Sequence, residues 1–300
     1  MAVEAAAFAP RRTDVLAAGA AGITVALWAS AFVGIRSAGH HLSPASLALG
    51  RLVVGAIVLG ALVLARREPL PKARDLPLIA LSGLLWLAAY SVALNAAERR
   101  IDAGTAAMLV NIGPILIALL GGFLLGEGFP GGLFAGCAIA LVGVVAIGLA
   151  TSTRTAGGWG TTLCLIAALG YAGGVVTQKV VLQRVSPLPT IFVSCVVAAA
   201  ACSPAAPSLV RQLGDAPGSS VGWLVYLGAF PTAIAFTTWA YALSRTSAGR
   251  LAATTYLVPA LSILMGWTLL GETPPALAFA GGAVCLAGVA VARRRPIRRS

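Results

Sequence analysis

Charged residues are scarce in this sequence, and acidic ones are the scarcest. Of the 300 residues, 10% are charged and nine are Asp or Glu, whereas 59% are hydrophobic. A soluble globular domain carries about a quarter charged residues, so this composition excludes an ordinary soluble enzyme or binding module. Together with a mean hydropathy of +0.93, the shortage of charge predicts an all-α integral membrane protein.

Groups that hold metals or form disulfides are also sparse. His40 and His41 are adjacent in a predicted turn, and metal binding would need further ligands that are not evident nearby. The cysteines lie inside apolar runs without C-x-x-C spacing, where cysteine usually behaves as a small hydrophobic residue. They are Cys137, Cys164, Cys195, Cys202 and Cys285. We therefore expect no disulfide, no metal site and no cofactor.

The sequence lacks any basic patch interleaved with aromatic residues. Its formal net charge of +12 would suggest nucleic acid as a partner if the protein were soluble. Here the basic residues stand between long apolar runs. We therefore expect anionic lipid headgroups, and no nucleic acid, as their partner.

Long apolar runs dominate what is present. A hydrocarbon core about 30 Å thick is crossed by about 20 apolar residues of helix. Ten stretches meet that length: 15–35, 44–65, 76–95, 103–125, 131–150, 160–181, 188–207, 221–241, 249–271 and 276–292. The first resembles a signal peptide with an A-x-A site at Ala29–Ala31, but its apolar run of about 21 residues exceeds the ~7–15 of a signal core. We predict ten transmembrane helices, with cleavage of the first as an alternative, and the longest connection around residues 207–220.

The distribution of Lys and Arg orients these spans. Fifteen of the 21 basic residues fall on the side that holds both termini, five fall on the opposite side, and Arg51 lies inside a span. Cytoplasmic loops carry the excess of basic residues in membrane proteins. We therefore predict a multi-pass protein of the cell inner (cytoplasmic) membrane with both termini in the cytoplasm.

One segment of the chain recurs 145 residues later. Residues 103–144 match residues 248–289 at 19 of 42 positions without a gap, which indicates an internal duplication. The front of the repeat is weaker, although Ser43-Pro44 matches Ser186-Pro187 at an offset of 143. Each copy holds five predicted helices, and an odd number forces the second copy to insert upside down. We predict two inverted five-helix repeats, 1–150 and 151–300, an architecture of secondary transporters.

Two motifs resemble a known family. The stretch LWASAFVGIR, from Leu27 to Arg36, resembles the opening signature of the drug/metabolite transporter superfamily, and the two LLGE turns that end at Glu127 and Glu272 resemble its EamA repeat. The resemblance implies a ten-helix carrier of small metabolites, such as amino acids or similar amphipathic compounds, that is often an exporter and works by alternating access. No Walker motif is present, so such a carrier would use a gradient or facilitated diffusion. The oligomeric state is left open.

An integral-membrane enzyme and a non-transporting membrane scaffold are the alternatives. An enzyme would need paired carboxylates, a histidine cluster or a Ser/Lys or Ser/His pair at depth, and the sequence shows only two adjacent loop histidines. A scaffold would not need pseudo-symmetric broken helices. We therefore expect no catalytic residues.

Each copy of the repeat has a proline inside a span. Pro114 and Pro259 remove a backbone hydrogen bond and free the carbonyls of Val110 and Thr255, which in hydrocarbon need a partner or a watery cavity. Because the prolines occupy equivalent places in the two halves, they are candidate hinges that line a cavity. A static packing kink is the alternative.

The glutamates of the two LLGE turns, Glu127 and Glu272, follow a glycine at the end of a span. A carboxylate there can favour the positive N-terminus of the next helix, so we interpret both as turn locks, with proton coupling as the alternative. Inverted topology would place them on opposite faces of the membrane. Small cationic-drug antiporters of the same superfamily rely on a carboxylate in the first span; this first span has none, which disfavours that route.

Arg51 is the charge that lies well inside a span, about seven residues after Pro44 and hence about 10 Å along the helix. A buried charge needs a partner or an aqueous niche. It could anchor a substrate carboxylate or phosphate. Alternatively, its side chain extends to the extracytoplasmic interface, or it pairs with another group and ties helices together.

Aromatic and polar side chains supply the rest of a predicted substrate pocket. Tyr256 aligns with Asn111 at the repeat offset, which would put two polar groups at matching depth. The alternatives are an interfacial aromatic belt and hydroxyl groups that bond their own helix. The candidates besides Arg51 are Trp28, Ser30, Trp86, Tyr90, Asn111, Tyr171, Gln178, Trp239, Tyr241, Thr255 and Tyr256.

Overall fold

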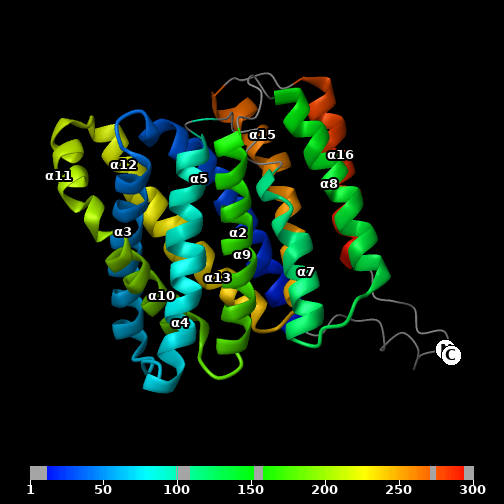
Figure 1. Ribbon diagram of the computed structural model, residues 1–300, viewed down its shortest axis with the longest axis horizontal. Helices are drawn as coiled ribbons and strands as arrows, with labels where there is room; N and C mark the ends of the chain where they lie inside the picture. Colours follow the sequence, from blue (N-terminus) through cyan, green and yellow to red (C-terminus); the bar gives the residue numbers. More distant parts are fainter. Residues whose placement is uncertain (1–11, 99, 101–108, 152–157, 271–274, 294–300) are drawn as a thin grey trace.

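The computed structural model describes residues 12–98, 100, 109–151, 158–270 and 275–293. Every regular element in these ranges is helical, and the helices form one bundle with their axes roughly side by side (Figure 1). Up to residue 151 the elements are α2 (Arg12–Gly39), α3 (Pro44–Arg66), η2 (Ala73–Asp75), α4 (Leu76–Ser82), η3 (Gly83–Ala89), α5 (Tyr90–Glu98), α7 (Gly113–Leu124) and α8 (Gly131–Thr151).

The second part of the chain, from residue 158 to residue 293, is helical as well. Its elements are α9 (Gly158–Val181), α10 (Pro187–Ala201), η4 (Ser203–Ala205), α11 (Ala206–Asp215), α12 (Gly218–Leu227), η5 (Gly228–Ile234), α13 (Ala235–Leu243), α14 (Ala248–Ala253), η6 (Thr254–Tyr256), α15 (Leu257–Leu270) and α16 (Ala276–Arg293). The turns after α3, α7, α9 and α13 lie at one end of the bundle, at the bottom of Figure 1. We call it the basic end because it carries Arg67, Lys72, Arg184 and Arg245.

The helices are long and apolar enough for a multi-pass membrane protein. Within the described residues, six helices could cross a bilayer by length and composition, and a seventh is added if the bent pair α10 and η4–α11 counts as one. The remaining predicted spans fall on helices that are shorter or interrupted: α7, α14–α15 and α16. The count of ten therefore stays a prediction.

The predicted seventh span and the loop after it are placed differently in the structure. The span 188–207 ends at Ala201, where the chain bends by 53°. The predicted long connection contains the helix α11. Pro207 lies in its first turn, where a missing N–H costs no intrahelical bond. The amide oxygen of Gln212 accepts a hydrogen bond from the N–H of Ser43 at 2.8 Å, which holds this helix against the start of α3.

Both intraspan prolines lie just after a break in their helix. Pro114 occupies the first turn of α7, which begins at Gly113. Pro259 lies in the first turn of α15, which follows the 3₁₀ turn η6. The sequence predicts that these prolines break their spans, as hinges or as static kinks. In the structure each span is interrupted just before its proline, and the ring lies in the first turn of the helix that follows, where it is tolerated.

Two π-helical segments interrupt the third and eighth predicted spans, and they are equivalent in the repeat. Segment η3 covers Gly83–Ala89 and η5 covers Gly228–Ile234, so both of their bounds differ by 145. A Cβ on Gly83 would lie 2.5 Å from the Ser194 carbonyl oxygen, and one on Gly228 would lie 2.8 Å from that of Arg51. Each segment thus packs closely on a helix of the other half, and only glycine permits the approach.

Helices α8 and α16 form a close antiparallel pair at one side of the bundle (Figure 1). A Cβ on Gly143 would lie 2.6 Å from the carbonyl oxygen of Gly281, and one on Gly281 would lie 2.7 Å from that of Gly143. Gly136 meets Ala292, and Gly288 meets Ala140, in the same way. At the offset of 145, the contact of Gly288 with Ala140 corresponds to that of Gly143 with Cys285, and the contact of Gly136 with Ala292 corresponds to that of Gly281 with Ile147, so the interface has the form of a two-fold pair.

We predict that Gly143→Val destabilises the protein by about 1–3 kcal/mol, the usual cost of overpacking a close contact. The added atoms would meet backbone atoms of α16, which cannot rotate away as a side chain can. The measurement is unfolding in detergent followed by circular dichroism. Gly282→Ala is the matched control, because its Cβ would meet the Ala260 Cβ at an ordinary 3.6 Å. Equal stability of the two variants would contradict the prediction.

Candidate functional site

A cavity of about 130 Å³ lies in the centre of the bundle between both halves of the chain. Drug-sized sites span about 300–1,000 Å³, so in this state the cavity suits a small metabolite. Nine of its lining residues are ones that the sequence singles out: Trp28, Arg51, Trp86, Tyr90, Asn111, Pro114, Tyr171, Thr255 and Pro259. The structure thus brings both prolines and seven of the twelve pocket candidates to one cavity.

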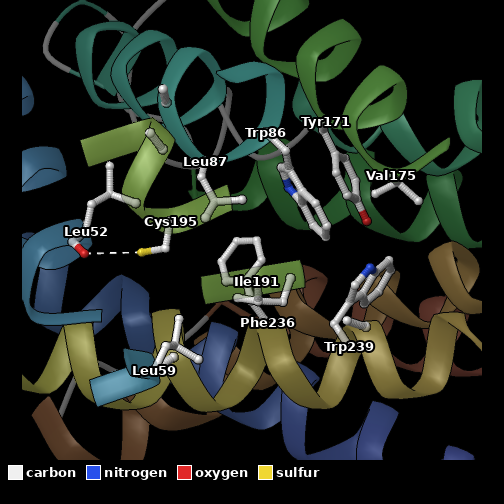
Figure 2. Packing of buried hydrophobic residues seen from close by; sticks show 14 of the residues in the cluster. Leu52, Leu59, Trp86, Leu87, Tyr171, Val175, Ile191, Cys195, Phe236 and Trp239 are labelled. Atoms are coloured by element: carbon white, nitrogen blue, oxygen red, sulfur yellow. Dashed lines mark hydrogen bonds between the residues drawn. The ribbon is translucent and has the colours of Figure 1, made fainter. Parts of the chain in front are cut away.

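An aromatic cluster forms the floor of this cavity. Trp86 has its ring centroid 4.8 Å from that of Phe236 and 5.3 Å from that of Tyr171. Trp239 lies one turn further along α13 and is fully buried, with its ring centroid 5.1 Å from that of Trp28. Figure 2 shows Trp86 and Tyr171 facing Phe236 and Trp239 from separate helices. Because α13 runs toward the basic end, these rings close the cavity on that side.

Arg51 is held at the cavity by a hydrogen-bond chain that ends at the carbonyl of Leu227 in the other half. Pro231 lies inside η5 and has no N–H, so this carbonyl cannot accept from the residue four positions on, as it would in an α-helix. The hydroxyl of Thr232 donates to that carbonyl at 2.8 Å and accepts from Nε of Arg51 at 3.1 Å. In the described part of the chain, no carboxylate lies within ion-pair distance of Arg51. The ion pair found there joins Arg74 and Asp75.

The wall beyond Arg51 is more polar than the floor. Ser91 and Asn95 line it from α5, and Asn111 lines it from the break before α7. The side-chain amide of Asn95 donates to the carbonyl of Pro44 at 3.0 Å, which fixes α5 to the start of α3. The cavity therefore has an aromatic floor toward the basic end and a polar wall toward the opposite end.

The turn Ser244–Ser247 at the basic end is held by one group of each charge. The carboxylate of Glu127 accepts from the N–H of Ala248 at 2.7 Å and from that of Gly249 at 3.4 Å, at the start of α14. The ammonium of Lys179 donates to the carbonyls of Leu243 and Thr246, at the end of α13. Each charge thus has the sign that its helix end favours.

A second, polar cavity of about 390 Å³ lies at the basic end, lined by Glu127, Arg245 and Arg250 among others. Thr254 faces this second cavity, whereas its neighbour Thr255 faces the central one. The 3₁₀ turn η6 and the aromatic floor therefore separate two cavities that approach each other from opposite sides.

Five pocket candidates do not line the central cavity. Ser30 bonds the hydroxyl of Tyr226 at 2.6 Å, away from the cavity. Trp239 lies beneath the floor, and Tyr241 stacks under the guanidinium of Arg245 at 3.6 Å. Tyr256 is packed with α8 and α16, because the 3₁₀ turn gives it a different rotation from Asn111.

Gln178 is the fifth of these candidates and is fully buried in α9, seven residues beyond Tyr171 toward the basic end. Its amide has no hydrogen-bond partner among the described residues.

Sequence reasoning missed several residues of the site. Ser91 and Asn95 continue the face of Trp86 and Tyr90 by another turn, so helical spacing could have found them. Pro231 stands inside a predicted span and could have been read with the other two prolines. The sequence around Lys179 does not indicate its role, because the carbonyls that it binds lie more than 60 residues away.

The partner of Glu127 also differs from the expected one. The sequence predicts that it favours the next helix, α8, whereas it caps α14, 121 residues further on. Glu272 lies outside the described residues. In the described part of the chain, no three His, Cys, Asp or Glu side chains come together as metal ligands would.

Residues 16–149 and residues 158–294 each match the sequence model of one family, the EamA-like transporter family. The chain belongs to the EamA-like transporter family. The resemblance of the two LLGE turns to the EamA repeat is thereby confirmed.

A probable terminal-alkyne amino-acid exporter of Streptantibioticus cattleyicolor is 35% identical, over 92% of this chain and 93% of that protein. An uncharacterized Bacillus subtilis transporter, YdfC, is 32% identical over 89% and 87% of the two chains. A probable amino-acid metabolite efflux pump of Salmonella typhimurium is 26% identical over 89% and 91%. A crystal structure at 23% identity superposes with a TM-score of 0.76 over 92% and 96%, which shows a shared fold.

Proposed function

We propose that this EamA-like transporter exports small metabolites, amino acids or similar amphipathic compounds, by alternating access. The observation that carries the proposal is the pair of cavities on either side of the aromatic floor and η6. A carrier that works by alternating access needs such a barrier, because its binding site opens to one side of the membrane at a time. The printed names of two relatives, an amino-acid exporter and an amino-acid metabolite efflux pump, support the substrate class.

The architecture that suits this mechanism is ten spans in two inverted repeats, 1–150 and 151–300. The two-fold form of the contact between α8 and α16 supports it, because helices that are equivalent in the repeat run antiparallel. The shared offset of η3 and η5 supports it further. Transporters built this way bind substrate where the repeats meet, near the middle of the membrane. Pro114 and Pro259 would serve as hinges there, since both line the central cavity.

The basic end would face the cytoplasm, with both termini on that side of the cell inner membrane. In that orientation the structure is closed toward the cytoplasm by the aromatic floor and by Glu127 and Lys179. A reporter fused to the C-terminus that is active only in the cytoplasm should then be active. Activity of a reporter that works only outside the cytoplasm would contradict the orientation.

Counterflow in proteoliposomes tests the function. Liposomes containing the purified chain and a high internal concentration of one unlabelled amino acid should accumulate the same labelled amino acid transiently, because a carrier exchanges without net driving force. Protein-free liposomes and liposomes with a denatured sample are the controls. Absence of counterflow across a panel of amino acids, nucleobases and lipophilic drugs would reject a transport function of this kind.

A further inference from the structure

We propose that Arg51 is the anchor for a substrate carboxylate, and that the substrate of this cavity is a carboxylate with an apolar tail, amino acids included. The inference rests on the proposed transport function and names the substrate class of the same site. It follows from three observations: an uncompensated cation, an aromatic floor, and an asymmetry between the halves.

The guanidinium of Arg51 lines the cavity and keeps most of its hydrogen-bonding capacity. Arginine presents five N–H donors, and among the described residues its hydrogen-bond acceptor is the hydroxyl of Thr232. That hydroxyl carries no charge and already donates to Leu227. A planar carboxylate matches the fork of a guanidinium with two parallel hydrogen bonds, so an anion of this shape completes the site.

The position of Arg51 is fixed before any ligand binds. Thr232 can accept from Nε because its own hydrogen is directed to the carbonyl of Leu227. The neighbouring carbonyl of Pro231 accepts from the indole N–H of Trp28 at 3.2 Å. The guanidinium and the Trp28 ring are therefore held by adjacent residues of the same π-helical segment. A preset geometry of this kind lowers the ordering cost of binding.

The floor beneath Arg51 determines the other end of the ligand. Trp28, Trp86, Tyr171 and Phe236 present aromatic surface to the cavity. Such surface favours an apolar tail over a second charged group. A ligand whose carboxylate meets Arg51 would thus lay its tail on the aromatic floor, toward the basic end.

The second half of the chain does not repeat the charge. At the offset of 143 that relates Ser43-Pro44 to Ser186-Pro187, Arg51 corresponds to Ser194. Ser194 is fully buried and donates to the carbonyl of Ile79 at 3.2 Å, in a contact between helices. The scaffold is pseudo-symmetric but the anchor is single, so a ligand with one carboxylate has one orientation.

Binding to the purified chain in nanodiscs tests the anchor. The probes are L-norleucine and its amide, and hexanoate and hexanamide; each pair has nearly the same shape, and one member carries the carboxylate. Binding is followed by tryptophan fluorescence, since Trp28 and Trp86 line the cavity. In the wild-type chain we expect each carboxylate to bind at least about tenfold more tightly than its amide, since a charge-assisted, bidentate pair is lost in the amide.

Variants test whether the preference for the carboxylate over its amide depends on Arg51. Arg51→Gln should bring the ratio of the two dissociation constants near one, and Arg51→Lys should keep part of it. Ser194→Ala, at the equivalent position, should keep all of it. The comparison of ligands in the wild-type chain remains decisive if Arg51→Gln fails to fold. Equal affinities, binding of neither carboxylate, or a preference retained by a folded Arg51→Gln variant would overturn the proposal.

Counterflow separates this inference from the transport function on which it rests. Arg51-dependent binding of carboxylates without counterflow of any compound would reject transport and leave the anchor. Counterflow that is equally fast for carboxylates and amides, and unchanged in Arg51→Gln, would reject the anchor and leave transport.

Discussion

Glu127→Gln is expected to open the basic end of the protein about tenfold more often. The carboxylate of Glu127 accepts two backbone hydrogen bonds at the start of α14, where Ser247 makes no side-chain cap of its own. Hydrogen bonds to a charged group contribute about 1.5–3 kcal/mol, and 1.4 kcal/mol is about a factor of ten in population. A neutral amide keeps the shape and loses most of that contribution.

Labelling of a new cysteine measures this opening. Gln178→Cys places a thiol in a fully buried position beside Lys179, and the native cysteines in the described structure are buried as well. An impermeant thiol reagent applied to the basic end should label this position about tenfold faster when Glu127→Gln is added. Glu68→Gln is the matched control, because that carboxylate lies at the same end but makes an exposed hydrogen bond to Ser186. Equal labelling in both backgrounds would refute the closing role of Glu127.

Trp239→Ala is expected to cost about 3–5 kcal/mol of stability, as for other buried tryptophans. Its ring is fully buried and packs against the rings of Trp28, Trp86 and Tyr171 in tilted and edge-on contacts, so truncation leaves a hole directly under the cavity floor. The free energy of unfolding in mixed detergent micelles gives the loss. Unfolding at the same detergent composition as the wild-type chain would contradict the packing role.

Trp239→Phe separates the packing of the Trp239 ring from its buried N–H. The indole N–H has no hydrogen-bond partner among the described residues, and an unpaired buried donor costs about 1–3 kcal/mol. Replacing it with phenylalanine removes this cost and leaves a smaller void, so we expect stability close to that of the wild-type chain. A large loss of stability in this variant would mean that the N–H is paired after all.

Local spacing explains what the sequence could predict about the site. Trp86 and Tyr90 are four residues apart, and a helix puts such residues on one face whatever lies around it. The prolines are equally local, since a proline in the interior of a helix removes a backbone hydrogen bond whatever lies around it. For these reasons nine of the residues that line the central cavity could be singled out from the sequence.

Distant pairing explains what could not be predicted. The carboxylate of Glu127 reaches a helix end 121 residues away, and nothing near Glu127 distinguishes that end from the adjacent start of α8. Tyr256 and Asn111 align in the repeat, but a 3₁₀ turn rotates one of them out of the cavity. The helix α11 was missed because its Pro, Gly and Ser content is also typical of a loop.

The π-helical segments η3 and η5 each hold one residue more per turn than an α-helix does. Deleting a residue from Gly83–Ala89 would restore an α-helix, and because the π turn holds the extra residue, Tyr90 and Leu94 would keep their orientation toward the cavity. Replacing the π turn with α-helical turns without a deletion would instead turn these residues by about 100° around the helix axis. A one-residue gap at either segment, in an alignment of relatives, would therefore mark a chain that has lost the π turn and still presents the same pocket side chains.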